Sequence, residues 1–118
     1  MDEDELAEVI GGLVEAGALD DERFALGFAA DKRELRGWGP ERIAEALRER
    51  GLDESLVEAA LADEPGERVI ERALEVLAES GAEAGDEAAR ARALALLARR
   101  GYPLEVAYDA VRALERNG

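Results

Sequence analysis

Hydrophobic residues recur at helical spacing along almost the whole chain. Leu6, Val9, Ile10, Leu13 and Val14 are separated by steps of three and four, which is the period of an amphipathic helix. The same steps return in later segments, at Phe24 and Phe28, at Ile43 and Leu47, and at Leu56, Val57, Ala60 and Leu61. No segment alternates with the period of two that is typical of a strand. The pattern therefore predicts an all-α fold.

A helix boundary is predicted near residue 20. Gly17 is expected to end the first helix, because glycine is the residue preferred just past a helix end. Asp20 is expected to cap the second helix through its side chain. Leu19 and Phe24 flank this cap at the spacing of a hydrophobic staple, which fixes how a chain enters a helix.

The single tryptophan stands in a second break. Trp38 lies between Gly37 and Gly39, and Pro40 follows. Because proline is favoured at the first helical position, Gly39 is the expected cap and Gly37 the expected end of the preceding helix. Trp38 is then placed as a staple between two helices. Its ring is expected to be mostly buried against three apolar side chains, those of Phe24, Phe28 and Ile43.

The sequence also repeats. Residues 42–61 align without a gap on residues 92–111, so that Leu47 meets Leu97 and Gly51 meets Gly101. In each copy a helix, a glycine stop and a second helix follow one another; Asp53 is the expected cap of the second helix in the first copy. Such repeats indicate stacked helical units that share a continuous core.

The repeat divides the chain into three predicted units. Residues 1–19 are the last helix of a partial first repeat, residues 20–62 a second repeat of three helices, and residues 63–118 a third. A glycine-broken connector at 81–86 lies inside the third unit and is expected at the surface. The predicted fold is an elongated array of tandem three-helix repeats.

Composition excludes several kinds of chemistry. The chain has no cysteine and no histidine, which rules out disulfides, Cys/His zinc sites and His-assisted nucleophiles. Carboxylates such as Glu67, Glu71 and Glu75 recur every four residues, as on a solvated helix face. No nucleotide-binding or calcium-binding loop motif is present. We expect no enzyme activity, no metal and no cofactor.

Charge alternates along a chain whose net charge is −14. The net charges of residues 1–22, 23–50, 51–89 and 90–118 are −9, +2, −10 and +3. An acidic chain binds nucleic acid poorly, so weak or no binding to free DNA is expected. The basic residues are either paired with glutamates at helical spacing or form a partner-binding strip. The candidate strip is Lys32, Arg33, Arg36, Arg42, Arg99 and Arg100.

Two other classes are disfavoured. Residues 40–50 and 53–62 have the lengths of a helix–turn–helix. Residues 53–63, however, carry four acids and no base, which argues against readout of a major groove. No apolar run reaches the length that spans a bilayer, and the acidic start is unlike a signal peptide. We expect a monomeric cytoplasmic protein that does not bind membranes.

Two stretches carry a set of short motifs in a fixed order. Residues 17–61 carry "GALDDERF", an aromatic between glycines and "GPERI", and residues 93–111 carry "RRGY". In these motifs the chain resembles the RecX family, the bacterial regulators of the RecA recombinase. The resemblance covers roughly residues 6–115. It implies a curved array of three-helix repeats, without enzyme activity, that lodges in the groove of the RecA–DNA filament and suppresses its ATPase and strand exchange, with a role in DNA repair, homologous recombination and the SOS response.

The chain departs from the family's pattern in two places. The family usually begins with two further helices, so the resemblance implies that this chain starts at the third helix of the first repeat. The segment 67–80 is usually basic in the family but is acid-rich here, which weakens the case for DNA contact there. A helical adaptor or scaffold that binds another protein is the alternative function, and a direct DNA-binding regulator is a third.

Overall fold

The computed structural model describes the backbone of residues 2–117 and the side chains of these residues except those at 7, 9–16 and 18. Within this part the chain forms six α-helices and no strand, which confirms the all-α prediction. The helices are α1 (Glu3–Arg36), α2 (Pro40–Glu49), α3 (Glu54–Ala62), α4 (Gly66–Glu79), α5 (Glu87–Arg100) and α6 (Leu104–Asn117).

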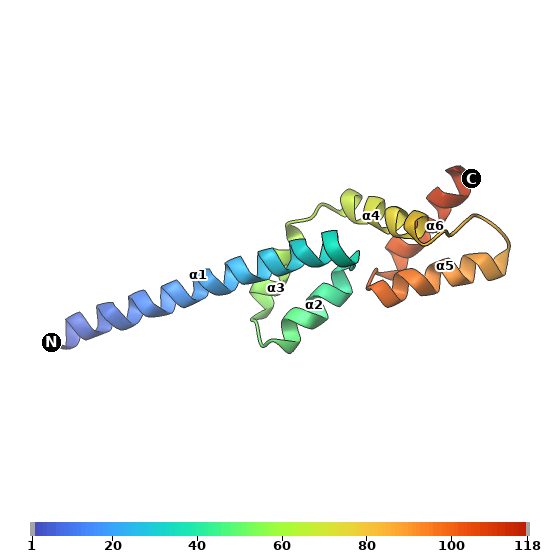
Figure 1. Ribbon diagram of the computed structural model, residues 1–118. Helices are drawn as coiled ribbons and strands as arrows, with labels where there is room; N and C mark the ends of the chain where they lie inside the picture. Colours follow the sequence, from blue (N-terminus) through green and yellow to red (C-terminus); the bar gives the residue numbers. More distant parts are fainter. Residues whose placement is uncertain (1, 118) are drawn as a thin grey trace.

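The molecule is elongated, with extents of 73 × 21 × 21 Å. Figure 1 shows why: the first half of α1 projects alone from the other helices, which gather around its second half and beyond. The elongated shape agrees with the sequence prediction. In the part of the chain that the structure describes, no helix is both long and apolar enough to cross a membrane.

The helix boundary predicted near residue 20 is wrong. The helix α1 runs without interruption from Glu3 to Arg36, so Gly17 does not end a helix and Asp20 does not cap one. Leu19 and Phe24 are both exposed, at 57% and 41%, and do not form a staple. The physical reason is that an internal glycine costs a helix only about 1 kcal/mol, and good helix formers on both sides propagate the helix across it.

The N-terminal hydrophobic pattern can be followed only in part. The side chain of Leu6 is 49% exposed, although its position belongs to the apolar stripe that the sequence predicted. The side chains of the other members of that stripe lie outside the described residues, namely Val9, Ile10, Leu13 and Val14. The unit boundaries predicted after residues 19 and 62 stay predictions.

Two helical bundles follow the projecting part of α1. The first bundle consists of the second half of α1 with α2 and α3, and the second bundle consists of α4, α5 and α6. Each bundle has its own apolar core, and alanine at the helix contacts lets the backbones approach closely. The first core contains Ala25, Ala29, Ile43, Ala44, Leu47, Val57 and Ala60. The second contains Val69, Ala73, Val76, Leu77, Ala93, Leu97, Tyr102, Ala107, Ala110 and Val111.

The 50-residue repeat has a structural counterpart in the two bundles. Leu47 and Leu97 are both fully buried, and Gly51 and Gly101 both have positive φ, of 82° and 94°. These glycines follow α2 and α5 and allow each chain to turn toward the next helix, a conformation that L-residues avoid. The glycine stops predicted at these two positions are confirmed.

The remaining helix ends follow the predicted signals. Gly37 ends α1 with φ of 65°, Gly39 caps α2, and Pro40 is the first residue of that helix. Asp53 stands at the cap position of α3, although its side chain makes no capping bond. The connector between α4 and α5, which contains residues 81–86, is irregular and mostly exposed, as expected.

Candidate partner-binding site at the junction of the two bundles

The two bundles meet through two glycine turns. The backbone N–H of Gly39 donates to the carbonyl of Arg100 at 2.7 Å, and the N–H of Glu41 donates to the carbonyl of Gly101 at 2.9 Å. The end of α5 therefore supplies acceptors to the start of α2, whose first N–H groups have no partner inside their own helix. A Cβ atom at Gly39 would stand 2.5 Å from the carbonyl oxygen of Gly101, so the approach requires glycine.

A buried arginine ties the same junction together. Arg72 of α4 donates through Nε and Nη2 to both carboxylate oxygens of Glu64, each at 2.7 Å. Its Nη1 donates to the carbonyl of Trp38 at 2.8 Å and to the hydroxyl of Tyr102 at 3.1 Å. The Tyr102 hydroxyl donates in turn to the carbonyl of Gly37 at 3.0 Å. One guanidinium thus links the turn after α1, the segment after α3 and the turn after α5.

Arg33 is also buried, which corrects its place in the candidate strip. Its Nη2 donates to the carbonyl of Ala60 at 2.8 Å, and its Nε lies 3.5 Å from Glu64 Oε1. The side chains of Arg33 and Glu64 are only 9% and 6% exposed. Burial lowers the pKa of Arg33, and the neighbouring Glu64 carboxylate opposes that shift. Arg33 therefore holds α1 against α3, and its buried side chain offers little surface to a partner.

Tyr102 makes the junction sensitive to high pH. Its side chain is 2% exposed, and burial raises the pKa of Tyr102 to about 12, with the positive charge of Arg72 opposing the shift. The folded protein therefore holds the phenolic proton more tightly than the unfolded chain does. The resulting stability is fully present below pH of about 10 and is lost between pH of about 10 and 12.

We expect the free energy of unfolding to fall by about 2 to 3 kcal/mol across this pH window through Tyr102 alone. Urea unfolding of the parent and of Tyr102→Phe at pH values between 8 and about 11.5 measures the effect. Tyr102→Phe should start from a lower stability, because it loses two hydrogen bonds, but should show a smaller fall at high pH. An equal fall in both proteins would contradict the assignment to Tyr102.

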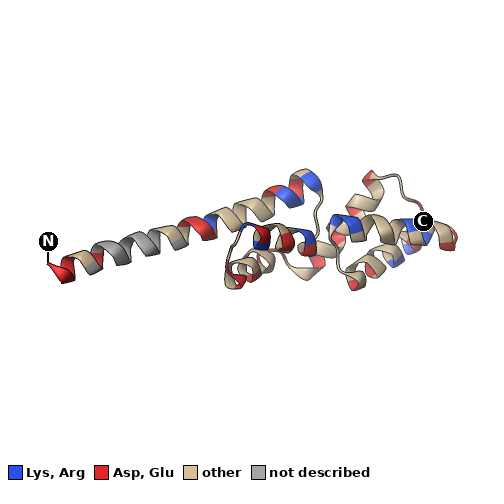
Figure 2. Cartoon of the chain, turned by 90° about the horizontal axis from the view of Figure 1, so that it is seen from below, with Lys and Arg blue, Asp and Glu red and all other residues tan. Residues whose placement is uncertain are grey.

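Four of the other five cations of the candidate strip lie around Trp38. Lys32, Arg36, Arg42 and Arg100 line an open hollow of about 400 Å³ with the Trp38 side chain, and we call it the basic hollow. Lys32 Nζ lies 4.8 Å and Arg42 Cζ 4.4 Å from the centroid of the Trp38 ring, within the range of cation–π attraction. Figure 2 shows basic residues at the end of α1 and in the middle of the molecule, and acidic residues at the start of α1.

Trp38 is partly buried and packs on the first core, which contains Ile43. Its ring meets the Phe28 ring edge-on with centroids 6.3 Å apart. Phe24 contacts Phe28 instead, with centroids 5.7 Å apart, and the Arg50 guanidinium lies over both phenylalanine rings. Trp38 therefore packs on the core that contains its predicted partner Ile43, and its ring remains partly open to solvent. Among the described ring contacts it meets Phe28, whereas Phe24 meets Phe28 only.

Arg99 lies outside the basic hollow. Its side chain is exposed and lines a separate hollow beside the connector between α4 and α5. The carbonyl of Arg99 accepts a hydrogen bond from Nη1 of Arg42 at 3.2 Å. The backbone of Arg99 therefore belongs to the junction, although its side chain does not. The structure thus brings four of the six predicted cations together, buries Arg33 and places Arg99 at one side.

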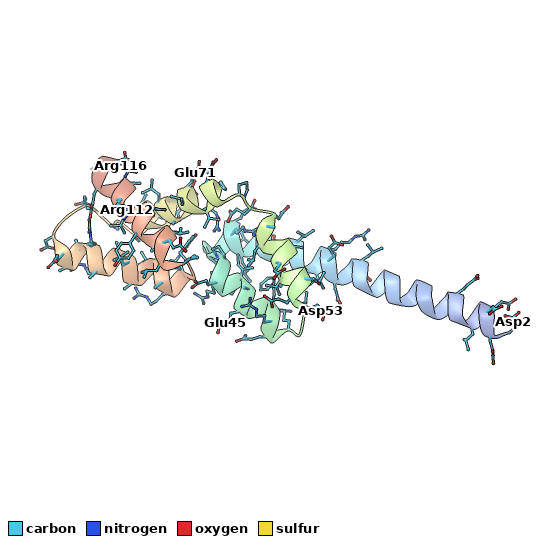
Figure 3. All side chains as sticks on the ribbon, turned by 180° about the vertical axis from the view of Figure 1, so that it is seen from behind. Asp2, Glu45, Asp53, Glu71, Arg112 and Arg116 are labelled. Atoms are coloured by element: carbon cyan, nitrogen blue, oxygen red, sulfur yellow. The ribbon has the colours of Figure 1, made fainter. Side chains whose placement is uncertain are left out.

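The acid-rich face of α4 holds no site. Glu71 and Glu75 both pair with Arg68, at 3.2 and 3.0 Å, and all three side chains are about half exposed or more. Figure 3 shows Glu71 pointing outward from α4. Among the described residues no group of carboxylates is arranged to hold a metal ion. The cations at the junction can attract an anion, and the hydrogen bonds there hold the backbone of the two glycine turns in place. Among the described residues of the junction, no nucleophilic side chain stands beside a general base.

Sequence reasoning missed Arg72, Glu64 and Tyr102. A signal was present for the arginine, because Arg72 falls on the apolar stripe of α4 between Val69 and Val76. Charged residues are rarely fully buried unless they are paired. An arginine on an apolar stripe of an otherwise acidic segment therefore indicates a buried acidic partner.

Comparison with known proteins identifies the family. The sequence model of "RecX, second three-helix domain" matches residues 20–61. The chain is 34% identical over 116 residues to "Regulatory protein RecX" of Thermus thermophilus, and the match covers 98% of this chain and 75% of that protein. The chain belongs to the RecX family. The resemblance read from the sequence is confirmed.

Other RecX-family relatives are similar over less of their length. The chain is 32% identical over 117 residues to "Regulatory protein RecX" of Mycobacterium sp. (strain JLS), and spans 64% of that protein. A 62-residue stretch is 39% identical to the protein of the same name from Leuconostoc citreum, and covers 23% of it. These relatives are named as regulatory proteins and not as enzymes. No solved structure matches the chain.

The segment that matches the RecX domain model begins at residue 20, inside α1, and ends at Leu61 in α3. It contains Trp38 and the turn around it, together with three of the four cations that line the basic hollow. The fourth cation, Arg100, comes from the second bundle. The basic hollow therefore depends on the contact between a recognised RecX domain and the helices that follow it.

Proposed function

We propose that this chain is a non-enzymatic modulator of the RecA recombinase that binds in the groove of the RecA–DNA filament and inhibits its ATPase and strand exchange. In this proposal the chain acts in the cytoplasm as a monomer and needs no cofactor. It binds free DNA weakly or not at all. Membership of the RecX family supports the choice of RecA as the partner.

The observation that carries the proposal is an unpaired basic surface on a strongly acidic protein. The chain has 29 acidic and 15 basic residues, yet the ion pairs among the described residues include none of the cations of the basic hollow. Because these cations form no ion pair with the carboxylates of the described residues, they are available to an external anion. The proposed contact surface is Lys32, Arg36, Arg42, Arg99 and Arg100.

The rest of the molecule suits an electrostatic competitor. A groove that holds DNA is lined with positive charge, and a chain with a net charge of −14 is attracted to it. The basic surface then meets acidic filament surface or the bound strand. Such steering is weakened by salt. Binding to bare single-stranded DNA stays weak because few positive sites are present and acids flank them.

Charge reversal of Arg36 and Arg42 tests the proposal. We expect the Arg36→Glu/Arg42→Glu variant to keep the helical content of the parent and to bind RecA filaments on single-stranded DNA about tenfold or more weakly. Added salt should lower the filament affinity of the parent more steeply than that of the variant. Co-sedimentation with filaments and the RecA ATPase rate, with each protein titrated in, measure the effect. Arg33 is left unchanged because it is buried.

The matched control is the Arg112→Glu/Arg116→Glu variant, which makes the same change in charge on the exposed face of α6 (Figure 3). It should bind filaments nearly as the parent does. If both variants bind equally well, the basic surface is not the contact. If the parent neither binds filaments nor slows the ATPase, the RecA proposal is wrong and the adaptor function, with another protein as partner, is favoured.

A further inference from the structure

We infer that the basic hollow is a binding site for a single phosphate group of a nucleic acid strand or a nucleotide. The inference deepens the proposed function, because it names the chemistry that part of the contact surface recognises. It rests on the lining of the hollow by Lys32, Arg36, Arg42 and Arg100 around Trp38. It can be tested on this protein alone, without RecA.

Two of the guanidinium groups are held in place by backbone. Nη1 of Arg100 donates to the carbonyl of Arg36 at 3.2 Å, and Nη1 of Arg42 donates to the carbonyl of Arg99 at 3.2 Å. A guanidinium has five N–H donors, so each keeps donors for an external acceptor. Because both groups are already positioned, little side-chain freedom is lost when an anion binds.

The surrounding helices explain how four cations tolerate one another without carboxylates. Helices α1 and α5 both end at the junction, at Gly37 and Gly101, and helix C-termini carry partial negative charge. This field offsets part of the repulsion among Arg36, Arg100 and their neighbours. It does not supply a counter-ion, since a helix end amounts to only about half a charge.

Trp38 determines which part of a ligand can be recognised. Lys32 and Arg42 already lie over its ring, and the edge-on contact with Phe28 fixes the ring on the core side. The ring is therefore occupied by cations and is not a free stacking platform for a base. The hollow senses charge and not base identity.

Phosphate fits these charges better than carboxylate does. Four cations surround the hollow, whereas a carboxylate brings a single negative charge. A terminal phosphate brings about two negative charges and three acceptor oxygens, and arginine matches its geometry with paired N–H donors. A phosphodiester brings one charge, but successive groups along a strand keep the local charge high. We assign the site to phosphate on this basis.

The single tryptophan of the chain reports directly on the hollow. An anion that draws Lys32 or Arg42 from the ring changes the electric field at the indole, and with it the emission of Trp38. Sodium pyrophosphate is titrated at low, constant ionic strength, with emission and calorimetry recorded in parallel. We expect saturable binding with half-saturation at or below about 1 mM, because several charge-assisted hydrogen bonds contribute.

Arg36→Gln is the informative variant, because the Arg36 side chain is exposed and makes no hydrogen bond or ion pair within the described residues. It should weaken pyrophosphate binding about tenfold. Arg116→Gln, in the last turn of α6 (Figure 3) and outside the lining of the hollow, removes the same charge and should bind as the parent does. Absence of both heat and emission change, or equal binding by Arg36→Gln and the parent, would overturn the site.

Further titrations separate the sources of the phosphate. An oligothymidylate of eight nucleotides without a terminal phosphate tests the phosphodiester of a strand, and the same oligonucleotide with a 5′-phosphate tests a terminal group. Saturable binding of either one that Arg36→Gln weakens supports the site and decides the source. A hexaglutamate peptide that binds as tightly as pyrophosphate at equal ionic strength would overturn the assignment to phosphate in favour of carboxylate.

Discussion

Replacing Arg72 with methionine is expected to lower the free energy of unfolding by about 3 to 5 kcal/mol, the cost of breaking a buried ion pair on one side. The side chains of Arg72 and Glu64 are 7% and 6% exposed. Without the guanidinium, Glu64 keeps only Arg33, whose Nε makes no hydrogen bond. The carbonyl of Trp38 and the hydroxyl of Tyr102 also lose a donor. Urea unfolding followed by circular dichroism measures the change.

Arg68→Met provides the matched control for this experiment. Arg68 lies one turn earlier on α4 and pairs with Glu71 and Glu75, but its side chain is 47% exposed. Exposed pairs contribute about 1 kcal/mol or less, so this variant should remain close to the parent. An Arg72→Met variant that is no less stable than Arg68→Met would show that the buried network does not hold the junction.

A double variant separates the lost ion pair from the change in packing. Glu64→Gln removes the negative charge but leaves an acceptor for Arg33. Arg72→Met combined with Glu64→Gln should be less destabilised than the sum of the two single variants, with a coupling energy of about 1 to 3 kcal/mol. Strict additivity would mean that Arg72 acts mainly through packing.

The parts of the fold that could be predicted from sequence are governed by local physics. Gly37, Gly51 and Gly101 end helices because each adopts positive φ, and Pro40 opens a helix because it needs no N–H partner. The same reasoning failed at Gly17, which has no positive φ. A glycine permits a helix to stop but does not force it to, and the helix formers around Gly17 decided the outcome.

The candidate site depended on contacts that local patterns do not contain. Arg33 and Arg36 are neighbours in a basic stretch and looked equivalent, yet only Arg33 is buried. The reason is Glu64, which is brought to Arg33 by the packing of α3 on α1. Likewise, Arg36 and Arg100 belong to different bundles and share a hollow only because the two glycine turns meet. Charge patterning therefore predicted most of the basic residues that gather there but not their geometry.

Replacing Gly101 with alanine is the second large expected effect, at about 2 to 5 kcal/mol of lost stability. A side chain at φ of 94° costs about 1 to 2 kcal/mol. The added Cβ would also overlap the Cβ of Arg42 and stand 2.5 Å from its backbone nitrogen, so α5 must move away from the start of α2. Forced overpacking of this kind costs about 1 to 3 kcal/mol more. Thermal and urea unfolding measure the loss.

Gly51→Ala isolates the contribution of the contact between the bundles. Gly51 occupies the equivalent position in the first bundle, with φ of 82°, but a Cβ there would meet no atom within 4 Å. This variant should lose only the cost of the backbone strain, about 1 to 2 kcal/mol. The difference between the two variants then measures the close approach of α5 to α2. Equal losses would mean that the second bundle is free to shift at Gly101, and that Arg100 is not held in a fixed place beside Arg36 and Trp38.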